Sequence, residues 1–281
     1  MPLIRSSVSH LSKDQIALIG IPFDAHSSFL QGPAKAPELI IEAIESDSAN
    51  YFTESLNDLN EHPRIAWCGN ADLEDYFSIS QPIQAILKKG AIPFSLGGDH
   101  SVTYPILKAI HKHHGKVNIL HFDAHTDLYD ELDDNKYSHA CPFARIMEEG
   151  LAESLTQVGI RTLTQHTKEQ AERFGVNIIQ MKDWTPETKF EIEGPVYLSF
   201  DIDVLDPAFA PGISHHEPGG FSTREILGII QQLDLDIVGL DVVEYNPDRD
   251  INGVTAMVAA KVVKELIDRL LWTRSILIKL F

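Results

Sequence analysis

Three side chains that can bind metal ions or move protons recur at every second position of one short segment, LHFDAHTDLYDE (120–131). Asp123, His125 and Asp127 follow an apolar lead-in that is typical of a buried strand. Residues i, i+2 and i+4 of an extended segment point to the same side, so we expect these groups to converge. Buried carboxylates without a partner lose their hydration and repel one another. A positive charge is therefore expected among them.

Three further apolar runs end in the same way. GGDHS (97–101) follows AIPFSL, DIDVLDP (201–207) follows VYLSF, and Glu244 ends DIVGLDVVE. Each motif alone has a structural explanation: a capped turn, a strand-to-helix turn with a side-chain cap, or an Asx turn before proline. Because four strands deliver acids or histidine to one rim, a shared site is the stronger interpretation.

The residue types at this rim favour a binuclear metal site. The candidate ligands are His100, Asp123, His125, Asp127, Asp201 and Asp203. Carboxylate oxygens with imidazole nitrogens suit Mn²⁺, with Zn²⁺ and Ni²⁺ as alternatives. These six ligands are more than one metal with an open position needs. The four carboxylates balance the charge of two divalent cations, with two aspartates bridging the ions. Two metals about 3.5–4 Å apart lower the pKa of a water held between them, so we predict hydrolysis.

Apolar, β-branched runs alternate with helical periodicity along the chain and must position these groups. The predicted strands are 16–23, 64–69, 91–96, 117–122, 155–160, 196–201 and 236–244. The helical patterns are 37–46, 102–114, 141–149, 171–175, 223–233 and 255–271. This alternation predicts a parallel sheet covered on both faces, in which ligands bind outside the carboxyl ends of the strands.

Composition limits the classes of partner. A formal charge of -18 argues against nucleic acid and anionic membranes and favours small cationic ligands. No run approaches the roughly 18 apolar residues of a membrane span. The apolar C-terminal LLWTRSILIKLF (270–281) is interrupted by Arg274 and Lys279, so we interpret it as an edge element or a subunit contact.

The 281 residues contain no repeat or long linker, which predicts a single domain over 1–281. Two cysteines, Cys68 and Cys141, make no disulfide framework, and the first residues lack the apolar core of a signal peptide. A reducing cytoplasm is the expected location. We interpret Cys141 as a buried structural thiol rather than part of a Cys/His nucleophile pair.

GGDHS, DAHTD and SFDIDVLDPAFAPG, in this order, resemble the signature motifs of the ureohydrolases, which include arginases and agmatinases. The resemblance runs from IGIPFD (19–24) through the helix after Glu244. It implies a three-layer α/β/α sandwich around a mostly parallel eight-stranded sheet. It also implies two Mn²⁺ ions, Ni²⁺ being possible, and hydrolysis of the C–N bond of a guanidinium group to urea and an amine. Members are commonly homotrimers or homohexamers.

The same resemblance implies roles for individual residues. One metal would be held by His100, Asp123, Asp127 and Asp201. The other would be held by Asp123, His125, Asp201 and Asp203. Glu244 matches the carboxylate that pairs with the substrate guanidinium, and His139, in YSHACPF, matches the proton-shuttle histidine. The proton would reach the leaving amine through Asp127 or His139, unless His139 instead caps the helix that follows it.

Departures from animal-type arginases leave the substrate open. VGIRTLTQHTKE lacks the acids with which those enzymes bind the α-amino group, and Tyr129 replaces an asparagine. DLYDELDDNKYSHACPFARIMEEG and NGVTAMVAAKVVKEL are similar to plant-type arginases. This favours L-arginine, hydrolysed to urea and L-ornithine, with agmatine, giving urea and putrescine, or another guanidino acid as alternatives. Asn135 is a candidate contact for a substrate carboxylate.

The remaining histidines divide by their position in the sequence. His215 and His216, in GISHHEPGG, are candidates for the mouth of the site, whereas HKHH (111–114) is interpreted as solvated surface.

A binuclear phosphoesterase would bring Lys or Arg near the metals, where this chain has Glu244. A metal-free binding relative would have lost ligands, and all six are present.

Overall fold

Eight parallel strands form one sheet in the computed structural model, which describes residues 3–279, with residues 273–279 described by their backbone alone. The strands are β1 Ile16–Gly20, β2 Ile65–Asn70, β3 Ile92–Leu96, β4 Val117–Phe122, β5 Ala152–Ile160, β6 Asn177–Gln180, β7 Pro195–Asp201 and β8 Asp236–Val243. Their order in the sheet is β2-β1-β3-β8-β7-β4-β5-β6. Every pairing is parallel.

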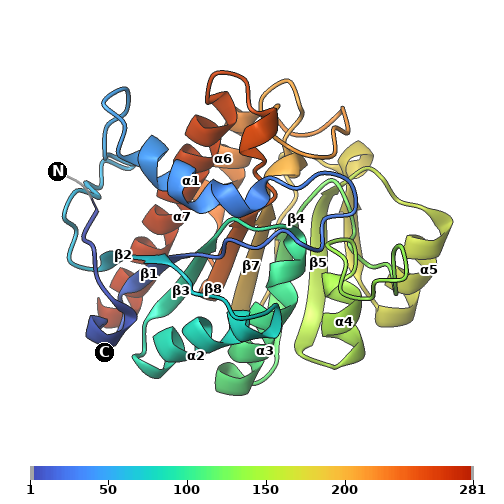
Figure 1. The fold of residues 1–281 in the computed structure, drawn as a ribbon, viewed down its shortest axis with the longest axis horizontal. Coiled ribbons are helices and arrows are strands. Elements are labelled where there is room, and N and C mark those ends of the chain that lie inside the picture. The colour runs from blue at the N-terminus through green and yellow to red at the C-terminus, as the bar shows by residue number, and fades with distance from the viewer. Residues whose placement is uncertain (1–2, 280–281) are drawn as a thin grey trace.

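Helices cover both faces of this sheet, which makes three layers (Figure 1). One face packs against α1 Ala36–Ile44, α6 Thr223–Gln232 and α7 Val254–Lys279. The other packs against α2 Ser80–Lys88, α3 Thr103–His114, α4 Pro142–Glu148 and α5 Gln165–Phe174. The central strands are buried on both faces, which explains their continuous apolar runs. The predicted three-layer α/β/α class is confirmed.

The four strands that were predicted to deliver the site residues are neighbours at the centre of the sheet, in the order β3-β8-β7-β4. The chain leaves β3, passes through α3 and returns in β4, and β8 and β7 lie between these two strands. Strand order reverses at such a point, which opens a crevice at the carboxyl ends where ligands bind.

Two elements were not predicted. The strand β6 has four residues, lies at the edge of the sheet and is only partly buried, so its sequence carries a weak apolar signal. Ser80–Lys88 forms α2 although Gln and Ser interrupt its apolar pattern, because Ile83, Ile86 and Leu87 alone reach the core.

The C-terminal segment is helical and not an edge element of the sheet, so that prediction is wrong. Its backbone continues α7 through Lys279, because the helical periodicity that begins near Val254 is not interrupted by proline or glycine. The predicted subunit contact of this segment falls largely on side chains outside those described. Within the described residues, no helix is long and apolar enough to cross a membrane.

Candidate metal centre

The turn after β3 carries His100 to the carboxyl rim of the sheet. Gly97 and Gly98 have φ values of 73° and 92°, in the left-handed region that favours glycine. A Cβ on Gly98 would lie 2.8 Å from Cγ1 of Val102 and 2.9 Å from the carbonyl oxygen of Ile21. The sequence GGDHS is therefore needed for the backbone of this turn as well as for the chemistry of His100.

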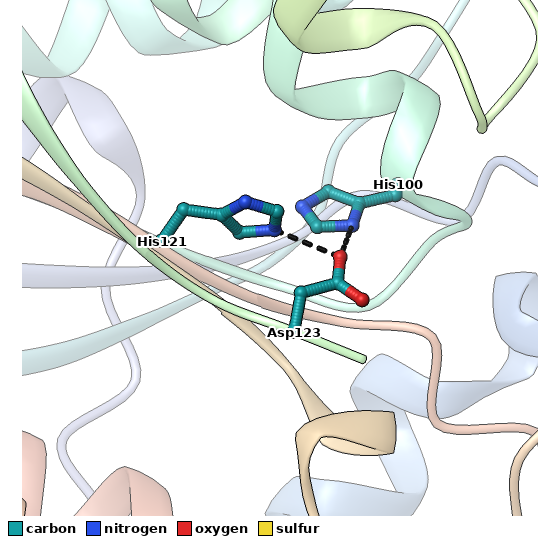
Figure 2. A group of neighbouring side chains, drawn as sticks. All are labelled: His100, His121 and Asp123. Carbon is teal, nitrogen blue, oxygen red and sulfur yellow. Dashed lines mark hydrogen bonds and ion pairs between the residues drawn. The ribbon is translucent and has the colours of Figure 1, made fainter. Parts of the chain in front are cut away.

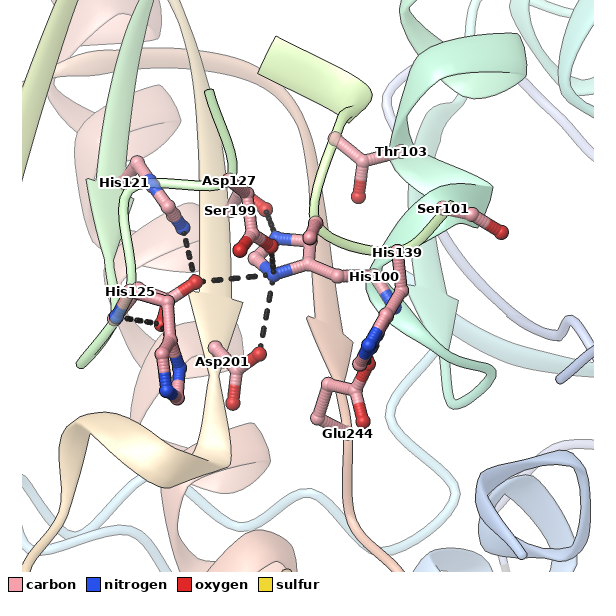
Figure 3. Close-up of polar contacts among 12 residues, drawn as sticks. His100, Ser101, Thr103, His121, His125, Asp127, His139, Ser199, Asp201 and Glu244 are labelled. Carbon is pink, nitrogen blue, oxygen red and sulfur yellow. Dashed lines mark hydrogen bonds and ion pairs between the residues drawn. The ribbon is translucent and has the colours of Figure 1, made fainter. Parts of the chain in front are cut away.

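Nδ1 of His100 is surrounded by three carboxylate oxygens (Figure 3). It lies 3.1 Å from Oδ2 of Asp123, 3.0 Å from Oδ2 of Asp127 and 3.1 Å from Oδ2 of Asp201. All four side chains are buried. Strands β4 and β7 and the segments that follow them thus bring their acids to the imidazole delivered by β3.

The other ring nitrogen of His100 indicates which tautomer the imidazole adopts. Nε2 lies 3.0 Å from Oγ of Ser199, and that hydroxyl donates to Oδ1 of Asp241 at 2.7 Å. Oδ2 of Asp241 accepts from Tyr197 and Thr103. With its hydrogen committed to Asp241, Ser199 accepts from Nε2–H, so neutral His100 presents the Nδ1 lone pair to three further acceptors. A cation among these four atoms satisfies all of them, so the residues fit a metal ion.

His125 forms a second group with acids from β4 and β7. Its Nδ1 lies 3.0 Å from Oδ2 of Asp203 and 3.4 Å from Oδ1 of Asp123. Asp123, His125 and Asp203 each offer a ligand atom within 4.8 Å of the others. Because Asp123 also contacts His100, this aspartate lies between the two groups. The His125 side chain is 29% exposed, and the second group thus reaches the surface.

Crowding moves the pKa values of these acids in opposite directions. Burial raises the pKa of Asp201, and the neighbouring Asp203 and Asp123 raise it further, well above its usual range. Burial also tends to raise the pKa of Asp123. The neighbouring His121 and His100 outweigh this effect and hold the pKa of that carboxyl well below its usual range. Asp201 therefore keeps a proton more readily than Asp123 unless a cation lies beside it.

His121 lies in this cluster and was not predicted as part of the site. Its Nε2 is 2.8 Å from Oδ2 of Asp123 (Figure 2), and Nε2 of Gln157 donates to its Nδ1 at 2.9 Å. Gln157 therefore places the imidazole hydrogen on Nε2, which holds Asp123 in position. A potential signal was present, because His121 precedes Asp123 by two residues and extends the alternation by one step.

Glu244 and His139 form a pair beside these acids. Oε1 of Glu244 lies 2.8 Å from Nδ1 of His139 and accepts from the backbone N–H of His100 at 2.9 Å. Burial alone would lower the pKa of His139, but the Glu244 carboxylate raises it to about 9. Burial opposes ionisation of Glu244, yet His139 lowers its pKa. The alternative that His139 caps α4 is wrong, because Cys141 occupies the N-cap.

A cavity of about 240 Å³ opens over these groups. Its lining combines carboxylates, imidazoles, hydroxyls and two apolar residues: Asp127, Asp201, Asp203, Glu244, His125, His139, His215, Ser28, Tyr129, Leu132 and Ala140. No lysine or arginine belongs to this described lining, so an anionic phosphate finds neither of its usual partners there. A small cation is the ligand that this charge pattern favours.

Other predicted residues lie outside the cavity lining. Asn135 is not part of it, and its carboxamide oxygen accepts from the backbone N–H of Tyr137 at 2.9 Å. His216 is exposed and contacts the carbonyl oxygen of Pro211, whereas its neighbour His215 lines the cavity. Cys141 is fully buried. In the HKHH run, all residues except the partly buried His111 are exposed.

The model of the arginase family matches residues 14–268. The chain belongs to the arginase family. Arginase 1, mitochondrial, from Arabidopsis thaliana is 46% identical over 277 residues, covering 91% of this chain and 81% of that protein. The predicted family and its hydrolase activity on a guanidino C–N bond are therefore confirmed.

Solved structures of arginase-family proteins have the same fold. The arginase from Medicago truncatula superposes with a TM-score of 0.85 at 43% identity, covering 91% of this chain and 87% of that one. A hypothetical agmatinase from Burkholderia thailandensis gives a TM-score of 0.86 at 29% identity, covering 96% of this chain and 90% of that one.

The predicted cytoplasmic location is wrong. Several plant arginases that resemble this chain are named as mitochondrial, and one as chloroplastic and mitochondrial, which points to an organelle. A low cysteine count argues against an oxidising compartment, but it does not distinguish the cytosol from the reducing interior of an organelle.

Proposed function

We propose that this chain hydrolyses the guanidinium group of L-arginine to urea and L-ornithine, and that residues 1–281 act as a single domain. The observation that supports it most is the His100 nitrogen that faces three carboxylates beneath a cavity whose described lining has no lysine or arginine. This arrangement favours metal ions between His100 and the carboxylates, and a cationic substrate in the cavity. The 46% identity to an arginase favours arginine among such substrates.

The proposed centre holds two Mn²⁺ ions, with Ni²⁺ as the alternative. One ion is assigned to His100, Asp123, Asp127 and Asp201. The other is assigned to Asp123, His125, Asp201 and Asp203. Asp123 and Asp201 are shared, in keeping with the contacts of Asp123 to both histidines. When bound, such a pair lowers the pKa of a water between the ions and so supplies a nucleophile near neutral pH.

The other groups bind and orient the substrate. Oε1 of Glu244 is occupied by His139 and by the backbone of His100, and Oε2 accepts no hydrogen bond from the described residues. We assign Oε2 to the guanidinium, which presents N–H donors in a planar fork. Asp127 takes the proton released by the attacking water, and protonated His139 supplies the proton that the leaving amine requires.

Agmatine is the second candidate substrate. The hypothetical agmatinase from Burkholderia thailandensis superposes as closely as the Medicago truncatula arginase does. Agmatine lacks the α-carboxylate of arginine, and Asn135, the predicted contact for that carboxylate, lies outside the cavity lining. Its guanidinium would meet the same Glu244.

Urea release tests the proposal directly. After preincubation with Mn²⁺ or Ni²⁺, the protein is assayed with arginine, agmatine, guanidinobutyrate and guanidine, and kcat/KM values are compared. We expect the highest value for arginine. Absence of urea from every compound would overturn the proposal, and a higher value for agmatine would select the second candidate.

Asp127→Ala tests the ligand assignment with a control from the same loop. We expect at least a thousandfold loss of kcat, because a ligand and a proton acceptor are removed together. Asp130→Ala is the matched control, since Asp130 is exposed and pairs with His166 at 3.0 Å. An Asp127 variant that retains activity would refute the ligand assignment.

We further propose that the protein assembles as a homotrimer or homohexamer, as the family resemblance implies. Light scattering coupled to size-exclusion chromatography measures the mass in solution. A single species of three or six times 31.4 kDa is expected. A monomer at micromolar concentration would contradict it.

A further inference from the structure

Both ring nitrogens of His139 have side-chain partners. Nδ1 lies 2.8 Å from Oε1 of Glu244, and Nε2 lies 2.8 Å from Oγ of Ser28. His139 is 8% exposed, whereas Ser28 is exposed and belongs to the cavity lining. Both residues line the cavity, and Nε2 of His139 has the Ser28 hydroxyl as its hydrogen-bond partner there.

The partners determine which way the protons point. An ionised Glu244 only accepts, so Nδ1 of His139 carries a hydrogen in both protonation states. In the neutral state Nε2 holds a lone pair and accepts from the Ser28 O–H. In the protonated state Nε2–H donates to Oγ of Ser28. A hydroxyl serves both states because it is at once a donor and an acceptor.

The loop that carries Ser28 is held by contacts that do not involve its hydroxyl. The His26 carbonyl oxygen accepts from the backbone N–H of His139 at 3.1 Å, and the backbone N–H of His26 donates to Oδ2 of Asp99 at 3.0 Å. Asp24 accepts from the backbone of Gly32 at 2.7 Å. Loss of the Ser28 hydroxyl should thus leave the loop in place.

We propose that Ser28 relays the proton from His139 to the leaving nitrogen of the guanidino substrate. As the C–N bond breaks, the leaving nitrogen keeps the bonding electron pair and takes the hydroxyl proton of Ser28. Oγ of Ser28 takes the proton of Nε2 in the same step, so the hydroxyl is regenerated and His139 becomes neutral. The proton that Asp127 takes from the attacking water recharges His139, and the second water proton passes to the freed amine as the urea carbonyl forms. This role rests on the proposed function.

Paired variants of adjacent serines test the relay. Ser28→Ala removes the hydroxyl, and Ser28→Thr keeps it. Ser27→Ala is the control, because the Ser27 hydroxyl donates to Asp99 at 3.2 Å and not to His139. We expect kcat to fall about 10- to 100-fold in Ser28→Ala with KM changed less than about threefold, since proton transfer contributes about 10²–10⁴. We expect Ser28→Thr and Ser27→Ala to keep kcat within about fivefold.

Several results would overturn the relay. An unchanged kcat in Ser28→Ala, or a rise in KM alone, would make the hydroxyl dispensable for proton transfer. A Ser28→Thr variant that is folded and metal-loaded but as slow as Ser28→Ala would show that the hydroxyl is not the active feature.

A second measurement separates the relay from the proposed function. Nitrogen-15 NMR of histidine-labelled, Zn²⁺-loaded protein avoids the broadening caused by Mn²⁺ and needs no turnover. The Nε2 resonance of His139 should shift in Ser28→Ala and stay in place in Ser27→Ala. No shift would refute the Ser28–His139 contact, whereas a shift in a protein that releases no urea would refute only the proposed function.

Discussion

At the scale of residues, the site depends on groups that hold the proposed ligands as much as on those ligands. Asp241 accepts hydrogen bonds from the hydroxyls of Ser199, Tyr197 and Thr103. Through the Ser199 hydroxyl it orients the imidazole of His100. Gln157 does the same for His121 and hence for Asp123. Such outer contacts select the tautomer of an imidazole and aim it at the metal.

Ser199→Ala should weaken metal binding without unfolding the protein. Loss of the hydroxyl frees Nε2 of His100, and outer-shell changes of this kind cost about 10- to 100-fold in metal affinity. Titration of the metal-free protein with Mn²⁺ measures the effect. Ser95→Ala is the control, because Ser95 is equally buried and its hydroxyl has no hydrogen-bond partner among the described residues. Equal affinities in the two variants would contradict the orienting role.

His215 is expected to influence the choice between arginine and agmatine. Its ring lines the cavity 5.3 Å from that of His139, and its buried Nε2 has no partner among the described residues. Since the described lining has four carboxylates and no lysine or arginine, the α-carboxylate of arginine needs another N–H donor there. His215→Ala should lower the arginine-to-agmatine ratio of kcat/KM about tenfold, or about 1.4 kcal/mol.

The neighbouring His216 provides the control for this substitution. His216 is exposed and contacts Pro211 rather than the cavity, so His216→Ala should leave the substrate ratio within about twofold. An equal loss of both activities in His215→Ala would show a general packing role and contradict the prediction.

At the scale of elements, the site depends on turns that leave four parallel strands with unusual backbone angles. Asp127 and Glu244 have φ values of 49° and 63° although neither is glycine. Such conformations cost about 1–3 kcal/mol and persist where surrounding contacts impose them. The contacts of Glu244 with His139 and with the His100 backbone are of this kind.

Gly98→Ala should destabilise the fold strongly. The new Cβ would meet Val102 and the carbonyl oxygens of Ile21 and Phe23 at 2.8–2.9 Å, and backbone atoms cannot move aside. We expect a loss of about 3 kcal/mol or more in the free energy of unfolding. Gly115→Ala is the matched control, because Gly115 also has positive φ but no atom lies within 4 Å of its added Cβ.

The Gly115 variant should lose less, about 1–3 kcal/mol, since it adds only the strain of its backbone conformation. Urea denaturation followed by circular dichroism measures both variants. If the two losses were equal, backbone conformation alone would account for them and the predicted clash would be wrong.

At the scale of the whole molecule, metal binding and folding should be coupled. The proposed ligands lie at the end of β7 and in the segments that follow β3, β4 and β7, and they come together only in the folded chain. A ligand that binds the folded state alone at 100 times its Kd adds about 2.7 kcal/mol. For a chain of 281 residues that corresponds to a Tm increase of about 5 °C.

Removal of metal with EDTA should lower the Tm, and added Mn²⁺ should restore it. Differential scanning calorimetry at pH 7.5 provides the measurement, and the Asp127→Ala variant should show a smaller metal-dependent increase. A wild-type Tm that does not respond to chelation or to added metal would contradict this coupling.

The sequence by itself predicted the residue types of the site and the strand ends that carry them. Alternation along Asp123, His125 and Asp127 indicates a shared side, and apolar runs before each motif indicate buried parallel strands, because both signals are local. The fold class and the family followed from the same motifs. The short edge strand β6 and helix α2 were missed, since their apolar signals are weak.

Only the tertiary structure decided which strands lie side by side and which side chains share the cavity. The order β3-β8-β7-β4 brings His100 to acids that are distant in the chain. The fold also brings Ser28 into contact with His139, which lies 111 residues further along the chain. It also leaves Asn135 out of the cavity lining, although that residue is only four positions from His139. Sequence periodicity determines the direction of a side chain within its own element, whereas packing of the layers determines which elements meet.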